Sequence, residues 1–153
     1  KLAMRKIQTG NSITRELRNR LENSIIETVP GATINGSLDL RVPNTTNISF
    51  EGIEAESLLI ALDLEGVSVS TGSACSSGTL EPSHVLRAMG LSASRGQSSI
   101  RFSLGLDNNQ AEVDQVAKIL PTLVSRLRNL RQSSRMPAHD SPPLVTIPKK
   151  GKN

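Results

Sequence analysis

The sequence predicts a single α+β domain of mixed α/β two-layer type, with a small antiparallel or mixed sheet and long flanking helices. Segments with helical apolar spacing are interspersed with short segments in which apolar and polar residues alternate. Their order is helix, strand, strand, helix, strand, loop, helix, strand, helix, which fits two packed layers. A length of 153 residues is enough for one domain with a buried core.

The first half of the chain is expected to supply two helices and three strands. The first helix should end before Pro30, because a residue that precedes proline avoids the helical region, and its start is left open at residues 10–12. Its apolar positions recur at helical spacing: Ile13, Leu17, Leu21 and Ile25. The other predicted elements are strands at residues 32–35, 45–50 and 67–70 and a helix at residues 55–63.

The second half begins with residues 71–82, which are small, polar and punctuated by glycine and so predict a mobile loop. Ser83 can cap a short helix that reaches Met89. A strand follows, with Ile100, Phe102 and Leu104 on one face and Ser99, Arg101 and Ser103 on the other. The last helix should run from Gln110 to about Leu130, since Asn109 and Glu112 have the spacing of a capping box.

Composition excludes several classes of function. With two Phe, no Tyr and no Trp, the chain lacks the aromatic platforms that bind single-stranded nucleic acid by base stacking. A single Cys excludes an internal disulfide and a Cys-rich zinc site, and it suits a reducing compartment such as the cytoplasm. His84 and His139 are too few and too isolated to predict a metal site. No apolar run approaches the length of a bilayer span, and no secretory signal is recognisable.

Residues 132–153 are expected to form a disordered, basic tail rich in Pro and Ser, because such a composition buries too little apolar surface to offset the entropy of ordering. The segment carries +3 of the formal net charge of +4, from Arg135, Lys149, Lys150 and Lys152 against Asp140. A weak electrostatic contact with nucleic acid or an acidic partner is one interpretation. A solvated terminal tail is the simpler one.

Two residues stand out chemically. Cys75 has glycines and serines around it and no apolar wall, so its thiol could be accessible and reactive; the alternative is a buried structural thiol. Arg101 lies between two serines on a predicted strand, where a planar guanidinium suits bidentate binding of a carboxylate. The alternative for Arg101 is a surface ion pair with a nearby Asp or Glu, which composition alone favours.

Three blocks of sequence resemble one known family. Residues 68–91, SVSTGSACSSGTLEPSHVLRAMGL, resemble the active-site loop of the cysteine desulfurases, the NifS/IscS-like members of the class V aminotransferase family. Residues 98–105, SSIRFSLG, resemble the next block of that family, and residues 43–50, PNTTNISF, followed by EAESLL at 54–59, resemble the block before it. The loop looks like the IscS/NifS type rather than the SufS type. The resemblance implies that residues 1–131 are the C-terminal small domain of a fold-type I pyridoxal-phosphate enzyme.

The resemblance also implies roles. In the family, pyridoxal phosphate holds L-cysteine as an aldimine, a loop thiolate attacks the substrate sulfur, and alanine is released. The resulting persulfide passes sulfur to an acceptor for iron–sulfur cluster or thio-cofactor assembly, and the full-length enzymes are homodimers. By position, Cys75 is the nucleophile and persulfide carrier, Arg101 is the clamp for the substrate carboxylate, and Asn47 lies at the edge of the substrate site.

One departure from the family is decisive for activity. The lysine that holds the cofactor lies on a Ser/Thr-His-Lys segment of the large domain, and this sequence has no counterpart to it. No cofactor-binding residue is therefore expected here, and the isolated chain is expected to be inactive without the large domain. A truncated or split desulfurase and a stand-alone persulfide carrier both fit; the missing initial Met and a first helix at the chain end favour truncation. A nucleic-acid binder that uses the tail, with an inert thiol, is the third interpretation.

Overall fold

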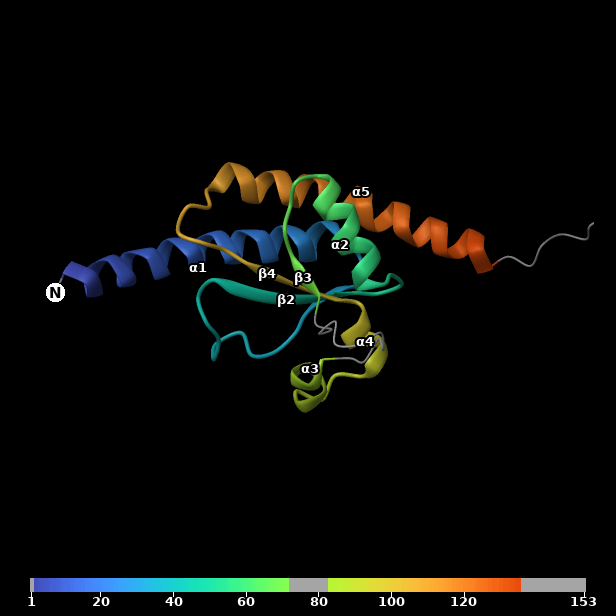
Figure 1. Ribbon diagram of the computed structural model, residues 1–153, viewed down its shortest axis with the longest axis horizontal. Helices are drawn as coiled ribbons and strands as arrows, with labels where there is room; N and C mark the ends of the chain where they lie inside the picture. The colour runs from blue at the N-terminus through green and yellow to red at the C-terminus, as the bar shows by residue number, and fades with distance from the viewer. Residues whose placement is uncertain (1, 72–82, 136–153) are drawn as a thin grey trace, which may run out of the picture.

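The computed structural model describes residues 2–71 and 83–135, with side chains described from residue 10 to residue 134 of these ranges. Figure 1 shows the long first and last helices above a small sheet, with the short helices of residues 84–97 below it. In chain order the elements are α1 (Leu2–Thr28), β1 (Ala32–Ile34), β2 (Thr45–Phe50), α2 (Ala55–Leu64), β3 (Ser70–Thr71), α3 (His84–Ala88), α4 (Ala93–Gln97), β4 (Ser99–Ser103) and α5 (Gln110–Arg135).

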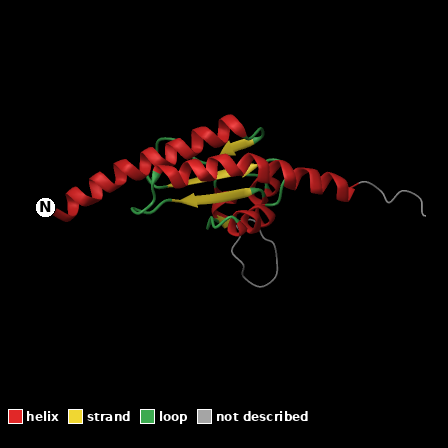
Figure 2. Ribbon diagram, turned by 90° about the horizontal axis from the view of Figure 1, so that it is seen from above, coloured by secondary structure: helices red, strands yellow, loops and turns green. Residues whose placement is uncertain are grey.

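The sheet has the strand order β1-β2-β4-β3, and each neighbouring pair is antiparallel. Seen from above, α1 and α5 lie across the strands (Figure 2). The α+β prediction is confirmed, with the sheet antiparallel throughout the described residues. The strands at 32–35, 45–50 and 99–104 and the helix at 55–63 are confirmed to within one residue at each end.

The core lies between the sheet and the layer formed by α1, α2 and α5. Apolar side chains at alternate positions of β2 and β4 are buried there, because successive residues of a strand point to opposite faces. The largest fully buried side chains include Ile25, Ile48, Phe50, Leu58, Leu62, Ile100, Leu120 and Val124. Burial of side chains of this size stabilises a fold by about 1.5–3 kcal/mol each.

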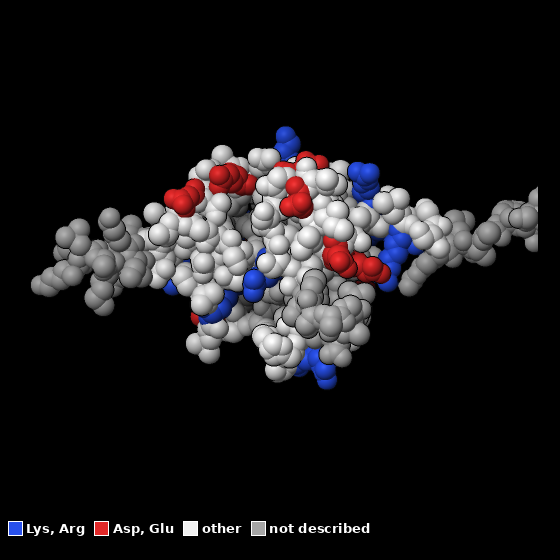
Figure 3. Space-filling model, in the orientation of Figure 1, with Lys and Arg blue, Asp and Glu red and all other residues white. Residues whose placement is uncertain are grey.

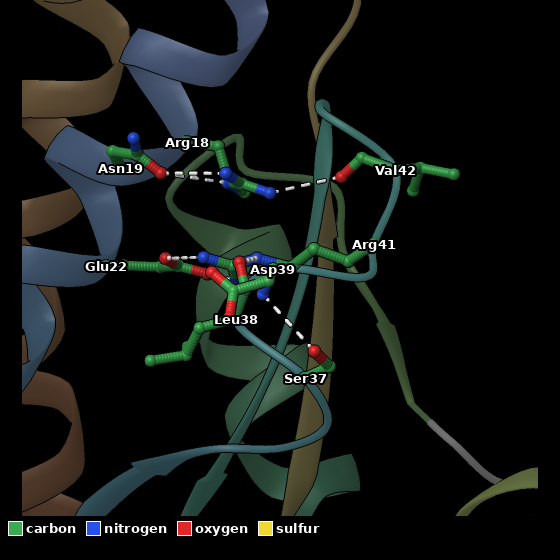
Figure 4. Close-up of polar contacts among 8 residues, drawn as sticks. All are labelled: Arg18, Asn19, Glu22, Ser37, Leu38, Asp39, Arg41 and Val42. Carbon is green, nitrogen blue, oxygen red and sulfur yellow. Dashed lines mark hydrogen bonds and ion pairs between the residues drawn. The ribbon is translucent and has the colours of Figure 1, made fainter.

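The loop between β1 and β2 is held to α1 by charged side chains (Figure 4). Glu22 of α1 accepts two hydrogen bonds from Arg41, one of them at 2.9 Å from Nη2. Arg18, one turn earlier, donates to the carbonyl oxygen of Val42 at 3.1 Å and to the side chain of Asn19. Burial lowers the pKa of Arg18, the like charge of Arg41 lowers it further, and the charge of Glu22 opposes both effects.

Helix α5 begins with the predicted capping box. The Asn109 side chain accepts from the Glu112 N–H at 3.1 Å, and the Glu112 carboxylate accepts from the Asn109 N–H at 3.2 Å. Hydrogen bonds from the Asn108 side chain and the Asn109 N–H hold the pKa of Glu112 below its ordinary value. The helix continues to Arg135, past the predicted end at Leu130.

The extension of α5 takes in the first four residues of the segment expected to be a tail. Ser133 and Ser134 donate their hydroxyl hydrogens to carbonyl oxygens four residues back, at 3.0 and 2.9 Å. Neither Gly nor Pro occurs between Leu130 and Met136, so nothing in this stretch breaks the helix. The rest of the predicted tail, 136–153, lies outside the described residues.

Three details differ from the sequence predictions. Ile13 was placed on the buried face of the first helix, but it is 50% exposed, because the buried face at this level of the helix passes through Thr14, which is buried. The third strand is β3 at Ser70–Thr71 rather than 67–70, because Val67 and Val69 pack as loop residues against the core. Helix α4 was not predicted. Ser83 stands at the N-cap of α3 as expected, without a side-chain capping hydrogen bond.

We predict that Glu22→Gln destabilises the fold by about 2 kcal/mol. The change removes the charge that faces two arginines from a position that is 3% exposed, and Arg41 recovers part of the loss by turning toward water. Urea unfolding measures the difference. Glu27→Gln, an exposed change on the same helix, is the matched control and should alter stability by less than about 0.5 kcal/mol. Equal losses in the two variants would contradict the role given to Glu22.

Candidate substrate site on the polar face of the sheet

The face of the sheet opposite the core carries a row of polar side chains, one from each strand. The strand register places Asn47 opposite Arg101 and Arg101 opposite Ser70. On the other side of Asn47, the backbone N–H of Asn35 donates to the Asn47 carbonyl oxygen at 2.8 Å, which continues the register by one residue beyond β1. Two of the three predicted site residues, Asn47 and Arg101, are therefore neighbours in this row.

Asn47 and Arg101 form the closer kind of cross-strand pair. The Phe50 N–H donates to the Ser98 carbonyl oxygen, and the Leu104 N–H donates to the Asn44 carbonyl oxygen. Residues at even-numbered positions of β2 therefore form the hydrogen-bonded pairs with β4, and residues at odd-numbered positions form the non-hydrogen-bonded pairs. At the odd positions the opposite Cα atoms approach to about 4.5 Å and side chains lie closer together. An amide and a guanidinium thus stand side by side on an open surface.

Arg101 is exposed, and its Nη2 donates to the Ser70 hydroxyl at 3.3 Å. In the described part of the chain, no Asp or Glu forms an ion pair with it; the ion pairs found there are Arg20–Asp114 and Arg41–Glu22. The surface ion pair that composition favoured is therefore not found among these residues. As far as the described residues go, the guanidinium has no carboxylate partner and can bind one.

Asn47 is half-buried and held in one orientation. Its Oδ1 accepts a hydrogen bond from Asn35 Nδ2 at 2.6 Å. Among the described residues, no acceptor lies within hydrogen-bond distance of Asn47 Nδ2. This amide nitrogen is consequently a second available donor next to Arg101.

A buried polar cluster supports one end of the row. Asn35 is 8% exposed, and its Nδ2 also lies 2.7 and 3.1 Å from the hydroxyl oxygens of Ser49 and Ser99. Arg95 of α4 donates from Nε to Asn35 Oδ1 at 2.9 Å and from Nη2 to the Ile34 carbonyl oxygen at 3.3 Å. Ser99 donates back to the Arg95 carbonyl oxygen at 2.6 Å. These contacts dock α4 onto the polar face of the sheet.

Sequence reasoning missed Asn35, Ser70 and Arg95 as parts of this face. The sequence offers little indication of these residues. Asn35 was interpreted only as the end of a strand. Ser92 precedes Arg95 at the spacing of an N-cap, but no helical repeat of apolar residues follows it. Ser92 does cap α4, since its side chain accepts from the Arg95 N–H. The contacts between Arg95 and Asn35 join residues 60 positions apart, which local pattern cannot reveal.

Cys75, the third predicted site residue, lies outside the described residues, as does the rest of the predicted loop after Thr71. The described segments that flank it are β3, which ends at Thr71, and the chain from Ser83 onward. Ser70, the residue next to Arg101 in the polar row, therefore belongs to the strand that leads into the Cys75 segment.

The described residues contain no cluster of three His, Cys, Asp or Glu side chains that could hold a metal ion. No described helix is long and apolar enough to cross a membrane. On the face shown in Figure 3, the Lys and Arg side chains of the described residues are scattered rather than gathered into one continuous basic patch.

Comparison with known proteins identifies the family. The aminotransferase class-V model matches residues 2–116. The chain belongs to this family. A cysteine desulfurase of Nostoc sp. is 47% identical over 124 residues, which are 81% of this chain and 31% of that enzyme. The cysteine desulfurase NifS of Azotobacter vinelandii is 42% identical over 128 residues, which are 84% of this chain and 32% of that enzyme.

A solved structure of a NifS-like protein superimposes with a TM-score of 0.70 at 30% identity, over 82% of this chain and 31% of that one. The class-V fold of the chain and its resemblance to the NifS/IscS-like desulfurases are thereby confirmed. The chain spans about a third of the length of the curated relatives that it matches.

Proposed function

We propose that this chain is the sulfur-handling portion of a cysteine desulfurase, in which Arg101 and Asn47 bind the α-carboxylate of L-cysteine and Cys75 accepts its sulfur. The pairing of Asn47 with Arg101 on an open polar face, where Arg101 has no carboxylate partner among the described residues, carries the proposal. The identity of 42–47% to curated cysteine desulfurases supports the same reaction class.

The guanidinium of Arg101 suits this task because its planar N–H groups can bind both oxygens of a carboxylate. Its contact with Ser70 restricts the side chain without neutralising its charge. A carboxylate bound in this row would lie next to the strand that leads into the Cys75 segment. Cys75 follows Thr71 by four positions, a span of at most about 14 Å in extended chain, so connectivity limits how far the thiol can lie from the row.

The proposed reaction balances without an external oxidant. The Cys75 thiolate attacks the sulfur of L-cysteine, a new S–S bond forms, and the substrate C–S bond breaks. The electron pair of the broken bond stays with the β-carbon, which takes up a proton, so that L-alanine leaves. Cys75 then carries a persulfide, whose outer sulfur passes to an acceptor.

Pyridoxal phosphate supplies the electron sink for such reactions when it is bound. None of the described residues is placed to bind this cofactor covalently. The described part of the polar face carries no lysine, and Lys118 is exposed on α5, which packs against the opposite face of the sheet. We therefore assign the cofactor to the two thirds of the enzyme that this chain does not span, and no step is derived through it here.

The resemblance to the cysteine desulfurases implies the partners of the full enzyme. They are L-cysteine, the large cofactor-binding domain, and a sulfur-acceptor or iron–sulfur scaffold protein, and the full-length enzyme is a homodimer. A lone thiol stays reduced in a reducing compartment, so we propose a cytoplasmic site of action.

We predict that the isolated 153-residue chain does not turn over L-cysteine. Without a lysine in a cofactor-binding context, the electron pair of the C–S bond has no acceptor. The purified chain is mixed with pyridoxal phosphate, L-cysteine and a reductant, and alanine and sulfide are quantified against free cofactor. A Cys75→Ala variant is the control. Production of alanine that depends on Cys75 would show that the chain is a complete catalyst and contradict the assignment.

A second prediction separates the roles of Arg101 and Cys75. In a chimera where this chain replaces the matching third of the Nostoc enzyme, Arg101→Lys should weaken L-cysteine binding by one to two orders of magnitude. A charge-assisted bidentate contact contributes about 1.5–3 kcal/mol, and the point charge of lysine reproduces it poorly. Cys75→Ser should abolish sulfur transfer and leave binding intact, because the thiol acts only after the substrate is bound.

Binding is measured by spectroscopic titration of the cofactor with L-cysteine, and sulfur transfer by sulfide release. Arg126→Lys, an exposed arginine of α5 away from the polar face, is the matched control. A change of less than about threefold in Arg101→Lys would fit an exposed contact worth about 0–1 kcal/mol and reject the clamp.

A further inference from the structure

Arg95, Asn35 and Asn47 form a chain of hydrogen bonds whose direction is fixed by chemistry. Arginine has donors and no acceptor. The atom of Asn35 that lies 2.9 Å from Arg95 Nε is accordingly the oxygen Oδ1, and the nitrogen Nδ2 is directed to the other side. That nitrogen lies 2.6 Å from Asn47 Oδ1. Each amide in the chain therefore has only one productive orientation.

Ser49 cannot impose this direction, because its hydroxyl lies within hydrogen-bond distance of both amide atoms of Asn35 and either donates or accepts. Ser99 supports the same direction, because its hydrogen goes to the Arg95 carbonyl oxygen and its oxygen can then only accept from Asn35. Arg95 thus acts on Asn35 through its side chain and, by way of Ser99, through its carbonyl oxygen. Its Nη2 bond to the Ile34 carbonyl oxygen and the bond from Ser99 to its own carbonyl oxygen keep it in place.

The direction of these hydrogen bonds also fixes the orientation of Asn47 in the row of polar side chains. Because Asn47 presents its oxygen to Asn35 on β1, its Nδ2 is left on the side of β4, where Arg101 is its non-hydrogen-bonded partner. We propose that Asn47 Nδ2 donates the second hydrogen bond to the carboxylate bound by Arg101, and that Arg95 and Asn35 are positioning residues that orient it. The identity of the carboxylate as that of an amino acid rests on the proposed function; the orientation rests on the contacts alone.

The alternative is that the cluster only docks α4 onto the sheet. Asn35→Asp distinguishes the two cases, because it keeps the shape and the contact with Arg95 and removes the donor. Asn47 must then turn its NH₂ group toward Asp at position 35. Its oxygen then faces Arg101, where it repels a carboxylate instead of binding one.

The test uses the 153-residue chain and nuclear magnetic resonance of side-chain N–H groups. L-alanine, the amino acid with the required carboxylate and no sulfur, is the probe, and ethylamine, which lacks the carboxylate, is the negative control. In the wild-type chain we expect L-alanine to shift both the Arg101 Nε–H and the Asn47 NH₂ signals. In Asn35→Asp the Asn47 response should disappear, and binding should weaken about tenfold, the effect of losing one hydrogen bond to a charged group.

Three further variants make the result decisive. In Asn47→Ala, adding Asn35→Asp should cause no further loss of binding; a further tenfold loss would show a direct charge effect and overturn the proposal. Arg95→Lys, which keeps a donor without an acceptor, should retain the Asn47 response, and Arg95→Met, which leaves only Ser99 to orient Asn35, should weaken it. Asn44→Asp is the matched control, since Asn44 donates to the Leu104 carbonyl oxygen outside the cluster.

Absence of an Asn47 response in a folded wild-type chain, with Arg101 responding, would also overturn the proposal. Sulfur transfer takes no part in this measurement. A chimera that binds L-cysteine but releases no sulfide would therefore count against the proposed function and leave the orientation of Asn47 to be decided by the titration.

Discussion

The register between β2 and β4 is the constraint on which the rest of the structure depends. It places Ile48 opposite Ile100 on the face covered by helices, and Asn47 opposite Arg101 on the other face. Because side chains alternate strictly along a strand, a slip of one residue would exchange the two faces. An unpaired guanidinium would then lie in the core at a cost of several kcal/mol. Packing of the core and geometry of the candidate site are thus decided by the same pairing.

The register is itself held by contacts outside the two strands. Helices α1, α2 and α5 accept the apolar side chains of β2 and β4, so only one alignment buries them all. At the N-terminal end of β2, Glu22 and Arg18 fix the loop that carries Arg41 and Val42, which limits where the strand can begin. On the polar face, Arg95 and Asn35 hold the opposite end. The strand that carries Asn47 is consequently restrained from both faces.

Much of this fold could be predicted from the sequence because the signals are local. Alternation predicted β2 and β4 and the face on which Arg101 lies, and the spacing of Asn109 and Glu112 predicted the start of α5. Helix α4 and β3 were missed or displaced because they are short and held by tertiary contacts. Val67 and Val69 alternate as in a strand, but they pack against the core outside the ladder.

The candidate site was less accessible to sequence reasoning for the same reason. Resemblance to a family singled out Asn47 and Arg101 one at a time, and neither pattern nor resemblance showed that they are cross-strand partners. Their relation depends on a pairing between segments more than 50 residues apart. Asn35 and Arg95, which orient Asn47, lie 60 positions apart in the sequence, and polar contacts between such distant segments give no periodic pattern in the sequence.

The polar face divides into a closed half and an open half, and the division has a chemical consequence. Asn35, Ser49 and Ser99 are buried and fully hydrogen-bonded, so they change little when a ligand arrives. Arg101 is exposed, and within the part of the chain that the structure describes its guanidinium contacts a neutral hydroxyl, that of Ser70. A binding group that is oriented in advance loses less entropy when it meets its ligand. Asn47 lies at the boundary, where the rigid half can fix its direction and the open half can give a carboxylate access to it.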